Sequence, residues 1–494
     1  MKKQLILALA CLCVLPMGAA ENLDSVPNYR RSSLYTFLVR SDAQDAKLEQ
    51  EVENTNEFTA LASSMVKKDQ DTTATAGMSK AKIAQKSFLE VEIPTQFNDH
   101  NLSVRVLDFD NYSVTDEEVK TANESQGTKK KKGFGKFAKG LGSAALGSNS
   151  AIIQTDTVEN KLAAVLLKFF EEQKTAPMLV GKWYNYTDSS KYNMELIFER
   201  GMQDASEQAK AEALASERGL AAVRDAGVEL IGNTFVIGVN LRYRSNKAVI
   251  AEAQKMADAV GGQFGGIGAL VSKVAGASAS AIAGEGFSVQ AVTYLYQLEW
   301  NEDILRTFEG KYWDKPIEEL VASGMCKLKF IGKDRSRASV SQSIFSKKSE
   351  SELVKRAVAR AIDEAICKLQ RTHEVFRTKA PVTRIDESGK FLYAQIGMKE
   401  GLEEKDEYTI LEAVEDENGK TTYNEVGTAV VEKGSIWDNR YGAADELAEV
   451  EAEAAEGKKV EFDSDAVNLG ETKFKFKSKA DLYPGMLLRL KKKK

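Results

Sequence analysis

The clearest hydrophobic pattern in the chain is helical and covers residues 351–372. Apolar side chains recur every four residues from Leu353 to Leu369, and a second row from Val354 to Ile366 lies beside the first. This stripe predicts an amphipathic helix with one buried face. Because such a helix gains little stability alone in water, we expect a sheet or another helix to cover the stripe. The opposite face is polar and mostly charged.

Alternation of apolar and polar residues predicts strands in the first two thirds of the chain. Two long strands are expected over residues 234–243 and 287–300, and a shorter one over 34–40. Further short strands are expected over residues 88–94, 102–109, 193–199, 325–331 and 338–344. Helices are expected over residues 159–173, 204–226 and 247–260. The central region is therefore predicted to mix helices with long strands.

Beyond Pro381 the period changes from helical to alternating. Five or more short strands with one small core are typical of a barrel, and we expect an SH3-like one. An acidic helix is predicted as an insertion over residues 443–456. The expected strands are residues 390–396, 407–414, 421–424, 427–432, 473–476 and 486–490.

The whole chain is predicted to have an α+β fold in several parts. A signal peptide occupies residues 1–20, and an N-terminal α+β region follows over 21–125. A Lys/Gly-rich linker covers 126–155. A central mixed α/β domain covers 156–379, and the C-terminal β-barrel covers 380–494.

The first twenty residues are typical of a cleaved secretory signal. Lys2 and Lys3 precede an apolar run, and small residues follow it at 18–20. We therefore expect export to the periplasm or the outer-membrane periphery of a Gram-negative bacterium. Lipidation at Cys11 or Cys13 is the competing interpretation.

Charge and cysteine content narrow the choice of partners. The formal net charge is −5 at pH 7, so the chain has no general attraction for polyanions, and nucleic acid is not an expected partner. Cys326 and Cys367 remain after the leader is removed. In an oxidising compartment they could pair, or they could be two small buried side chains; both interpretations stay open.

A segment near residue 130 combines positive charge with aromatic rings. Lysine is attracted to anionic lipid while apolar side chains insert, so the segment is a candidate for membrane or partner contact. A solvated linker is the alternative. The candidate residues are Lys129, Lys130, Lys131, Lys132, Phe134 and Phe137.

Residues suited to catalysis are scarce. The chain has two histidines, His100 and His373, and neither has the neighbours that a zinc site needs. No nucleophile elbow, metalloprotease or phosphate-loop motif is present. We expect no enzyme activity, no cofactor and no metal. Two carboxylate pairs keep a hydrolase as an alternative: Asp108 with Asp110, and Glu299 with Asp303.

The C-terminal part contains phrases that resemble a known type of barrel. They are Gln395-Ile396-Gly397, then residues 401–406, and Tyr483-Pro484-Gly485. They resemble the helix-plus-barrel end of envelope proteins of the curli-secretion and flagellar-assembly T type. Lys405 and Met486 stand where that pattern has Gly and Asp. The resemblance implies an envelope assembly or scaffold role.

Residues 199–235 look like uncharacterised secreted proteins of Bacteroides-type bacteria, a likeness that implies no activity. Together these features predict a non-enzymatic secreted envelope scaffold or assembly protein that acts through protein contacts. Its expected partners are envelope proteins and a second copy of the chain. The alternatives are a carboxylate-dependent hydrolase and a membrane-active protein with peripheral membrane contact.

Overall fold

Two β-sheets and the helices around them make up the described fold. The computed structural model describes residues 32–42, 46, 78–94, 96–124, 149–197, 200, 228–245, 285–342, 350–415, 421–445, 447–448, 451, 464–478 and 480–491. The leader at 1–20 and the predicted helices over 204–226 and 247–260 lie outside these ranges. Within them the fold is mixed α+β, as the sequence predicts.

The first sheet has six strands and mixed direction. β1 runs parallel to its neighbours β2, β3 and β4, while β4, β5 and β6 form an antiparallel series. The path along the sheet is β2-β1-β4-β5-β6, and β3 pairs with β1. The strands are β1 (Ser32–Arg40), β2 (Phe97–Asp99), β3 (Val106–Asp108), β4 (Thr234–Ser245), β5 (Glu285–Leu298) and β6 (Leu328–Gln342).

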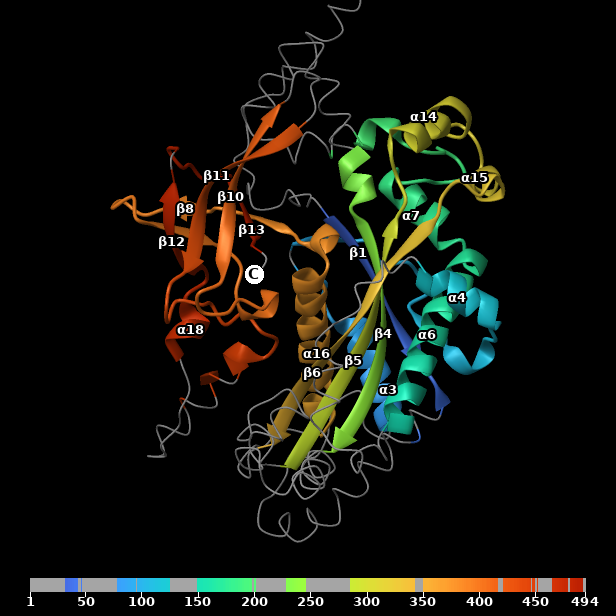
Figure 1. Ribbon diagram of the computed structural model, residues 1–494, viewed down its shortest axis with the longest axis horizontal. Helices are drawn as coiled ribbons and strands as arrows, with labels where there is room; N and C mark the ends of the chain where they lie inside the picture. Colours follow the sequence, from blue (N-terminus) through green and yellow to red (C-terminus); the bar gives the residue numbers. More distant parts are fainter. Residues whose placement is uncertain are drawn as a thin grey trace, which may run out of the picture.

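Helices cover both faces of this sheet, as Figure 1 shows. Leu34 and Leu38 of β1 point to one face, where they join the core formed with α3 (Lys80–Glu90) and α16 (Glu350–Thr372). Phe37 points to the other face, where α6 (Asn149–Glu172) packs. Because successive side chains of a strand face opposite sides, a sheet covered on both faces needs a nearly continuous apolar strand.

One end of the first sheet continues into a third apolar cluster. There α7 (Thr175–Trp183) packs with α14 (Glu302–Lys311) and α15 (Ile317–Ser323). Trp183 and Phe308 are completely buried at its centre. The cluster closes this end of the first module, which we define as the first sheet with its covering helices; the second module is the second sheet with η6 (Met398–Glu400).

The second sheet has seven strands, all antiparallel, and forms a half-barrel. Its order is β7-β13-β10-β11-β12-β9-β8, and its core includes Ile410, Phe474 and Leu488. Residues 379–385 contain both end strands, β7 and β8, and between them the Val382 amide donates to the Met486 carbonyl oxygen and the Thr383 amide to the Tyr393 carbonyl oxygen. The strands are β7 (Lys379–Pro381), β8 (Arg384–Ile385), β9 (Phe391–Ala394), β10 (Glu407–Glu415), β11 (Thr421–Val431), β12 (Thr472–Ser478) and β13 (Leu487–Leu490).

Two predicted strands are helical in the structure. Residues 88–90 end α3, because Ile83, Ala84 and Phe88 bury one helical stripe and Ser79 caps the first turn. Residues 194–197 are also helical. In both places the apolar run is so short that it fits the helical period as well as the strand period, and packing decides which of the two forms.

Two predicted strand pairs are single long strands. β6 crosses a charged stretch without a break because Lys333 and Arg335 pair with Glu159 of α6, which is 1% exposed. β11 runs through Gly427, where an added Cβ would lie 2.6 Å from the Lys477 carbonyl oxygen. That glycine permits close strand packing and does not mark a turn.

The predicted acidic helix over residues 443–456 is helical at 443–445 and 447–448, and most of its remainder lies outside the described ranges. Among the helices that the structure describes, none is long and apolar enough to cross a membrane.

Candidate functional site at the junction of the two sheets

Helix α16 lies between the two sheets (Figure 1). Its apolar stripe packs on β5, β6 and α3. Its polar face meets the second sheet and the short 3-10 helix η6 (Met398–Glu400), so Arg356, Asp363 and Cys367 are buried. The sequence identifies this face as polar but does not indicate that it is covered. We call the contact between α16 and the second sheet the junction.

Gly401 allows the closest approach at the junction. Its φ of 68° is left-handed, and an added Cβ would lie 2.7 Å from the Cys367 Cβ. Glycine is therefore required there both by conformation and by space. The glycine that opens residues 401–406 thus has a local physical cause.

An arginine–carboxylate pair connects α16 to the turn before β10. Arg371 donates to both oxygens of Asp406, at 2.6 Å and 3.4 Å. Asp406 is 1% exposed and also accepts from the Glu403 backbone amide at 3.0 Å. Its charge is thus compensated inside the junction, which makes the pair a structural connection between the modules.

Glu400 holds η6 against the segment that follows β11, well before α18 (Ser464–Asn468). One of its carboxyl oxygens accepts from the Gly397 amide at 2.6 Å and from the Asn439 side chain at 2.8 Å. Asn439 in turn accepts from the Lys399 amide at 2.8 Å. Burial raises the pKa of Glu400 above its ordinary value.

Asp363 is the most unusual group of the junction. Its Oδ1 atom is buried and has no hydrogen-bond partner. Burial raises the pKa of this carboxyl to about 7, against the opposing effect of Lys399 and together with that of Glu400. A buried carboxyl without a donor is expected to favour its neutral form. We therefore expect the Asp363 carboxyl to gain a proton as the pH falls through about 7.

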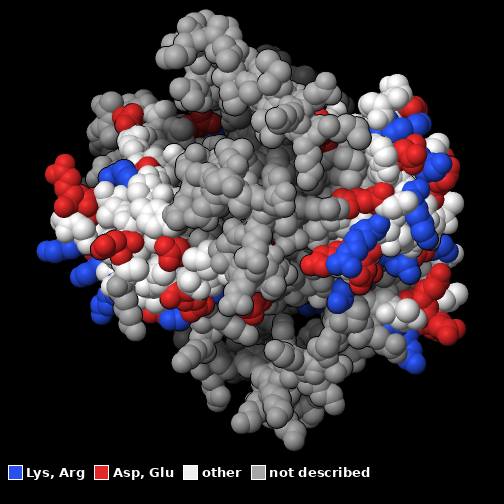
Figure 2. Space-filling view, turned by 90° about the horizontal axis from the view of Figure 1, so that it is seen from above, with Lys and Arg blue, Asp and Glu red and all other residues white. Residues whose placement is uncertain are grey.

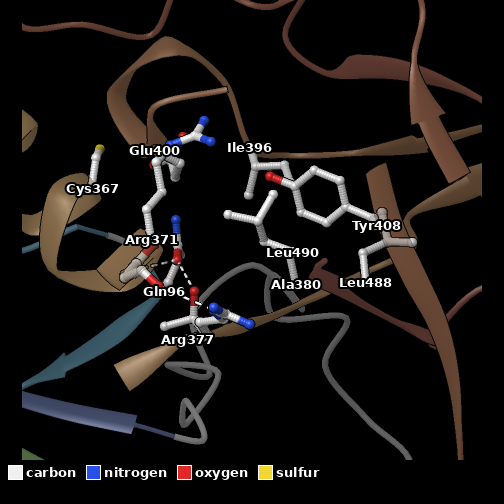
Figure 3. A pocket seen from close by; sticks show the side chains of 12 residues that line it. Gln96, Cys367, Arg371, Arg377, Ala380, Ile396, Glu400, Tyr408, Leu488 and Leu490 are labelled. Carbon is white, nitrogen blue, oxygen red and sulfur yellow. Dashed lines mark hydrogen bonds between the residues drawn. The ribbon is translucent and has the colours of Figure 1, made fainter. Parts of the chain in front are cut away.

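The pocket at the junction is small. Its cavity volume is about 20 Å³, which leaves room for one or two water molecules. In Figure 3 the apolar side chains lie together opposite Arg371, Arg377 and Gln96. The lining residues are Gln96, Cys367, Gln370, Arg371, Arg377, Thr378, Ala380, Ile396, Glu400, Tyr408, Leu488 and Leu490. The space suits a hydrated interface and is too small for a metabolite.

The two cysteines are buried free thiols, so the disulfide considered from the sequence is not formed. Cys326 lies in the cluster around Phe308, whereas Cys367 donates to the Lys399 carbonyl oxygen at 3.1 Å. Burial raises the pKa of Cys326 to about 12 and that of Cys367 well above its ordinary value. Protonated, buried thiols are poor nucleophiles.

Both histidines have structural contacts. His100 packs edge-on against Trp183, and burial lowers its pKa to about 3, so the ring is neutral near pH 7. His373 follows the last residue of α16, as predicted, and its Nε2 lies 3.1 Å from the Asp334 carboxylate of β6. In the part of the chain that the structure describes, no group of three or more metal-binding side chains comes together.

Three of the carboxylates that the sequence offers as hydrolase candidates, Asp108, Asp110 and Asp303, stabilise their own turn or helix. Asp108 and Asp110 accept from the backbone amides of Asp110 and Asp42 respectively, which holds the turn after β3. Asp303 lies in the first turn of α14, where negative charge favours a helix. The predicted contact residues Lys129, Lys130, Lys131, Lys132, Phe134 and Phe137 lie outside the described ranges.

Comparison with known proteins gives no match to any family model and none to any curated protein.

Proposed function

We propose that this protein is a non-enzymatic, exported scaffold or assembly component of the cell envelope. Its task would be to hold two folded modules in a fixed relation and to present their outer surfaces to partner proteins. The secretory pattern of residues 1–20 supports export to the periplasm or the outer-membrane periphery. The resemblance of the C-terminal phrases to envelope assembly proteins supports the same role.

The observation that carries this proposal is the double burial of α16. One face completes the core of the first sheet, and the other holds the second sheet through the Arg371–Asp406 pair. Asp406 and Glu400 are bound by side chains and backbone amides at the junction, and the space beside them admits only water. Such a junction suits fixing two modules better than turning over a substrate.

We further propose that the second sheet is an SH3-like barrel. The contacts of residues 379–385 with both β13 and β9 support closure of the sheet, since the same segment pairs at either end. A closed sheet leaves no exposed edge, which reduces unwanted strand addition. Its partners would then contact the faces of the strands.

Cross-linking in intact cells tests the proposed role. We expect the processed chain in the periplasmic or outer-membrane fraction, joined to envelope proteins or to a second copy. An Arg371→Met variant should lose many of these adducts because the modules separate, whereas a Lys311→Gln variant on exposed α14 should keep them.

Three results would overturn the proposal. One is a strictly monomeric protein recovered without partners. Another is an unprocessed chain resident in the cytosol. The third is turnover of a substrate that a single point change abolishes.

A further inference from the structure

The outer face of β12 carries a row of lysines. Residues 472, 474 and 476 point toward the barrel core, while Lys473, Lys475 and Lys477 alternate with them on the outside. Lys475 and Lys477 are exposed and Lys473 is half-buried. Alternate side chains of a strand are about 6.6–6.8 Å apart. The row therefore presents three evenly spaced positive charges over about 13 Å.

Aromatic rings hold two neighbouring cations against this face. The Lys473 Nζ atom lies 3.8 Å from the centre of the Phe391 ring, and the Arg384 guanidinium carbon lies 3.3 Å from that of Tyr393. In the sheet Lys473 stands opposite Tyr393, and Lys475 stands opposite Phe391. The contact with Phe391 restricts the Lys473 side chain, so less entropy is lost when an anion binds there, whereas Arg384 already pairs with Glu471.

Lys475 and Lys477 differ from the lysines that form ion pairs within the fold. Lys333 pairs with Glu159, and Lys379 pairs with Glu229. Among the described residues Lys475 and Lys477 take part in no ion pair. Three like charges in one row repel each other, so the row is better explained by an external anion than by stability of the sheet.

The row lies on the side of the molecule away from the first sheet. Figure 1 places β8 and β12 there, beyond β10 and β11 as seen from α16. Figure 2 shows Lys and Arg side chains at the corresponding left margin, with Asp and Glu side chains beside them. A partner could therefore reach the row without disturbing the junction.

We propose that this face binds an extended acidic peptide segment of a partner protein, with carboxylates at alternate positions. An extended peptide repeats its side chains at the same spacing as β12, so successive carboxylates meet successive lysines. Single-stranded nucleic acid fits less well, because the cations already cover the ring faces that bases would stack on. The inference rests on the proposed role as a protein-binding scaffold and names its partner chemistry.

Peptide binding to the purified full-length protein tests this proposal. The probe is a fluorescent peptide of four Glu-Thr repeats, and its control has four Glu followed by four Thr. We expect the alternating peptide to bind at least threefold more tightly at low salt, and the difference to shrink as salt is added. The double variant Lys475→Gln/Lys477→Gln should weaken binding by about three- to tenfold.

A matched variant separates this face from overall charge. Lys311→Gln/Lys315→Gln makes the same change of charge on the exposed end of α14 and should leave binding unchanged. Equal binding of the two peptides, or equal loss in both double variants, would overturn the proposal. So would tighter, variant-sensitive binding of single-stranded DNA or an acidic polysaccharide.

The outcome is separable from that of the proposed function. If cells carrying Lys475→Gln/Lys477→Gln keep all their cross-linked partners, the scaffold role stands and this face is not the contact. If the alternating peptide binds as expected but no partner is found in cells, the scaffold role fails. Unfolding curves of both double variants check that the fold is intact.

Discussion

Replacing Asp363 by Asn should stabilise the protein above neutral pH and have a much smaller effect in acid. The carboxyl is buried on α16, its Oδ1 atom has no donor, and its pKa is raised from 3.8 to about 7. Asn has nearly the same size and is neutral at every pH. The change therefore removes the ionisation of this group and little else.

The sign follows from which state holds the proton. Below pH 3.8 the carboxyl is neutral in both the folded and the unfolded chain, and its ionisation costs no stability. Between pH 3.8 and 7 the unfolded chain ionises while the folded chain keeps the proton, so stability falls as pH rises. Above pH 7 both states are charged and the loss is constant.

The size of the effect follows from the shift. Each pKa unit corresponds to about 1.4 kcal/mol, so the shift of Asp363 corresponds to about 4 kcal/mol as an upper limit. We expect the stabilisation by Asp363→Asn to be larger at pH 8 than at pH 4 by about 2–4 kcal/mol. Any cost of burying the amide is the same at both pH values, so it cancels when the stabilisation at pH 4 is subtracted from that at pH 8.

Urea unfolding of both proteins from pH 4 to pH 8 measures this difference. Asp314→Asn is the matched control, because Asp314 is exposed and water screens its charge. The raised pKa of Asp363 would be refuted if Asp363→Asn changed the free energy of unfolding equally at pH 4 and pH 8, or if its pH dependence matched that of Asp314→Asn.

Three further changes test other parts of the structure. Gly332→Ala should destabilise by about 1–3 kcal/mol in thermal unfolding, because the new Cβ would lie 2.4 Å from an imidazole carbon; Gly310→Ala, with open space around it, should not. Arg371→Met removes the cationic partner of the buried Asp406 carboxylate, and urea unfolding should show a loss of about 3 kcal/mol; no loss would remove the pair's structural role. The two buried cysteines should react with a thiol reagent in denaturant without reductant and only slowly in the folded protein; the absence of free thiols in denaturant would show that they pair.

Much of the local structure can be predicted from the sequence. The stripe from Leu353 to Leu369 predicts α16 to within a residue at its start, and strict alternation predicts β4 and β5. These segments are long and strongly periodic, so one period fits and the other does not. The change from helical to alternating pattern after residue 381 likewise lies within two residues of the start of the second sheet, at Lys379.

Where a pattern is short or interrupted, prediction fails for identifiable reasons. The Phe88 segment fits a strand until Ile83 and Ala84 join it on one helical face. The charges of β6 interrupt the apolar pattern, and only Glu159, far away in the sequence, explains why the strand continues. Long-range partners of this kind leave no local signal.

The sequence by itself determined the periods of the main helices and strands, the leader pattern and the scarcity of histidine. Tertiary structure alone decided that the polar face of α16 is covered, which gives Asp363 its raised pKa and Arg371 its partner. It also decided that Cys326 and Cys367 stay apart and that the lysines of β12 stay exposed. Local patterns reflect the few residues on one turn or strand, whereas burial and charge pairing depend on which distant segments meet.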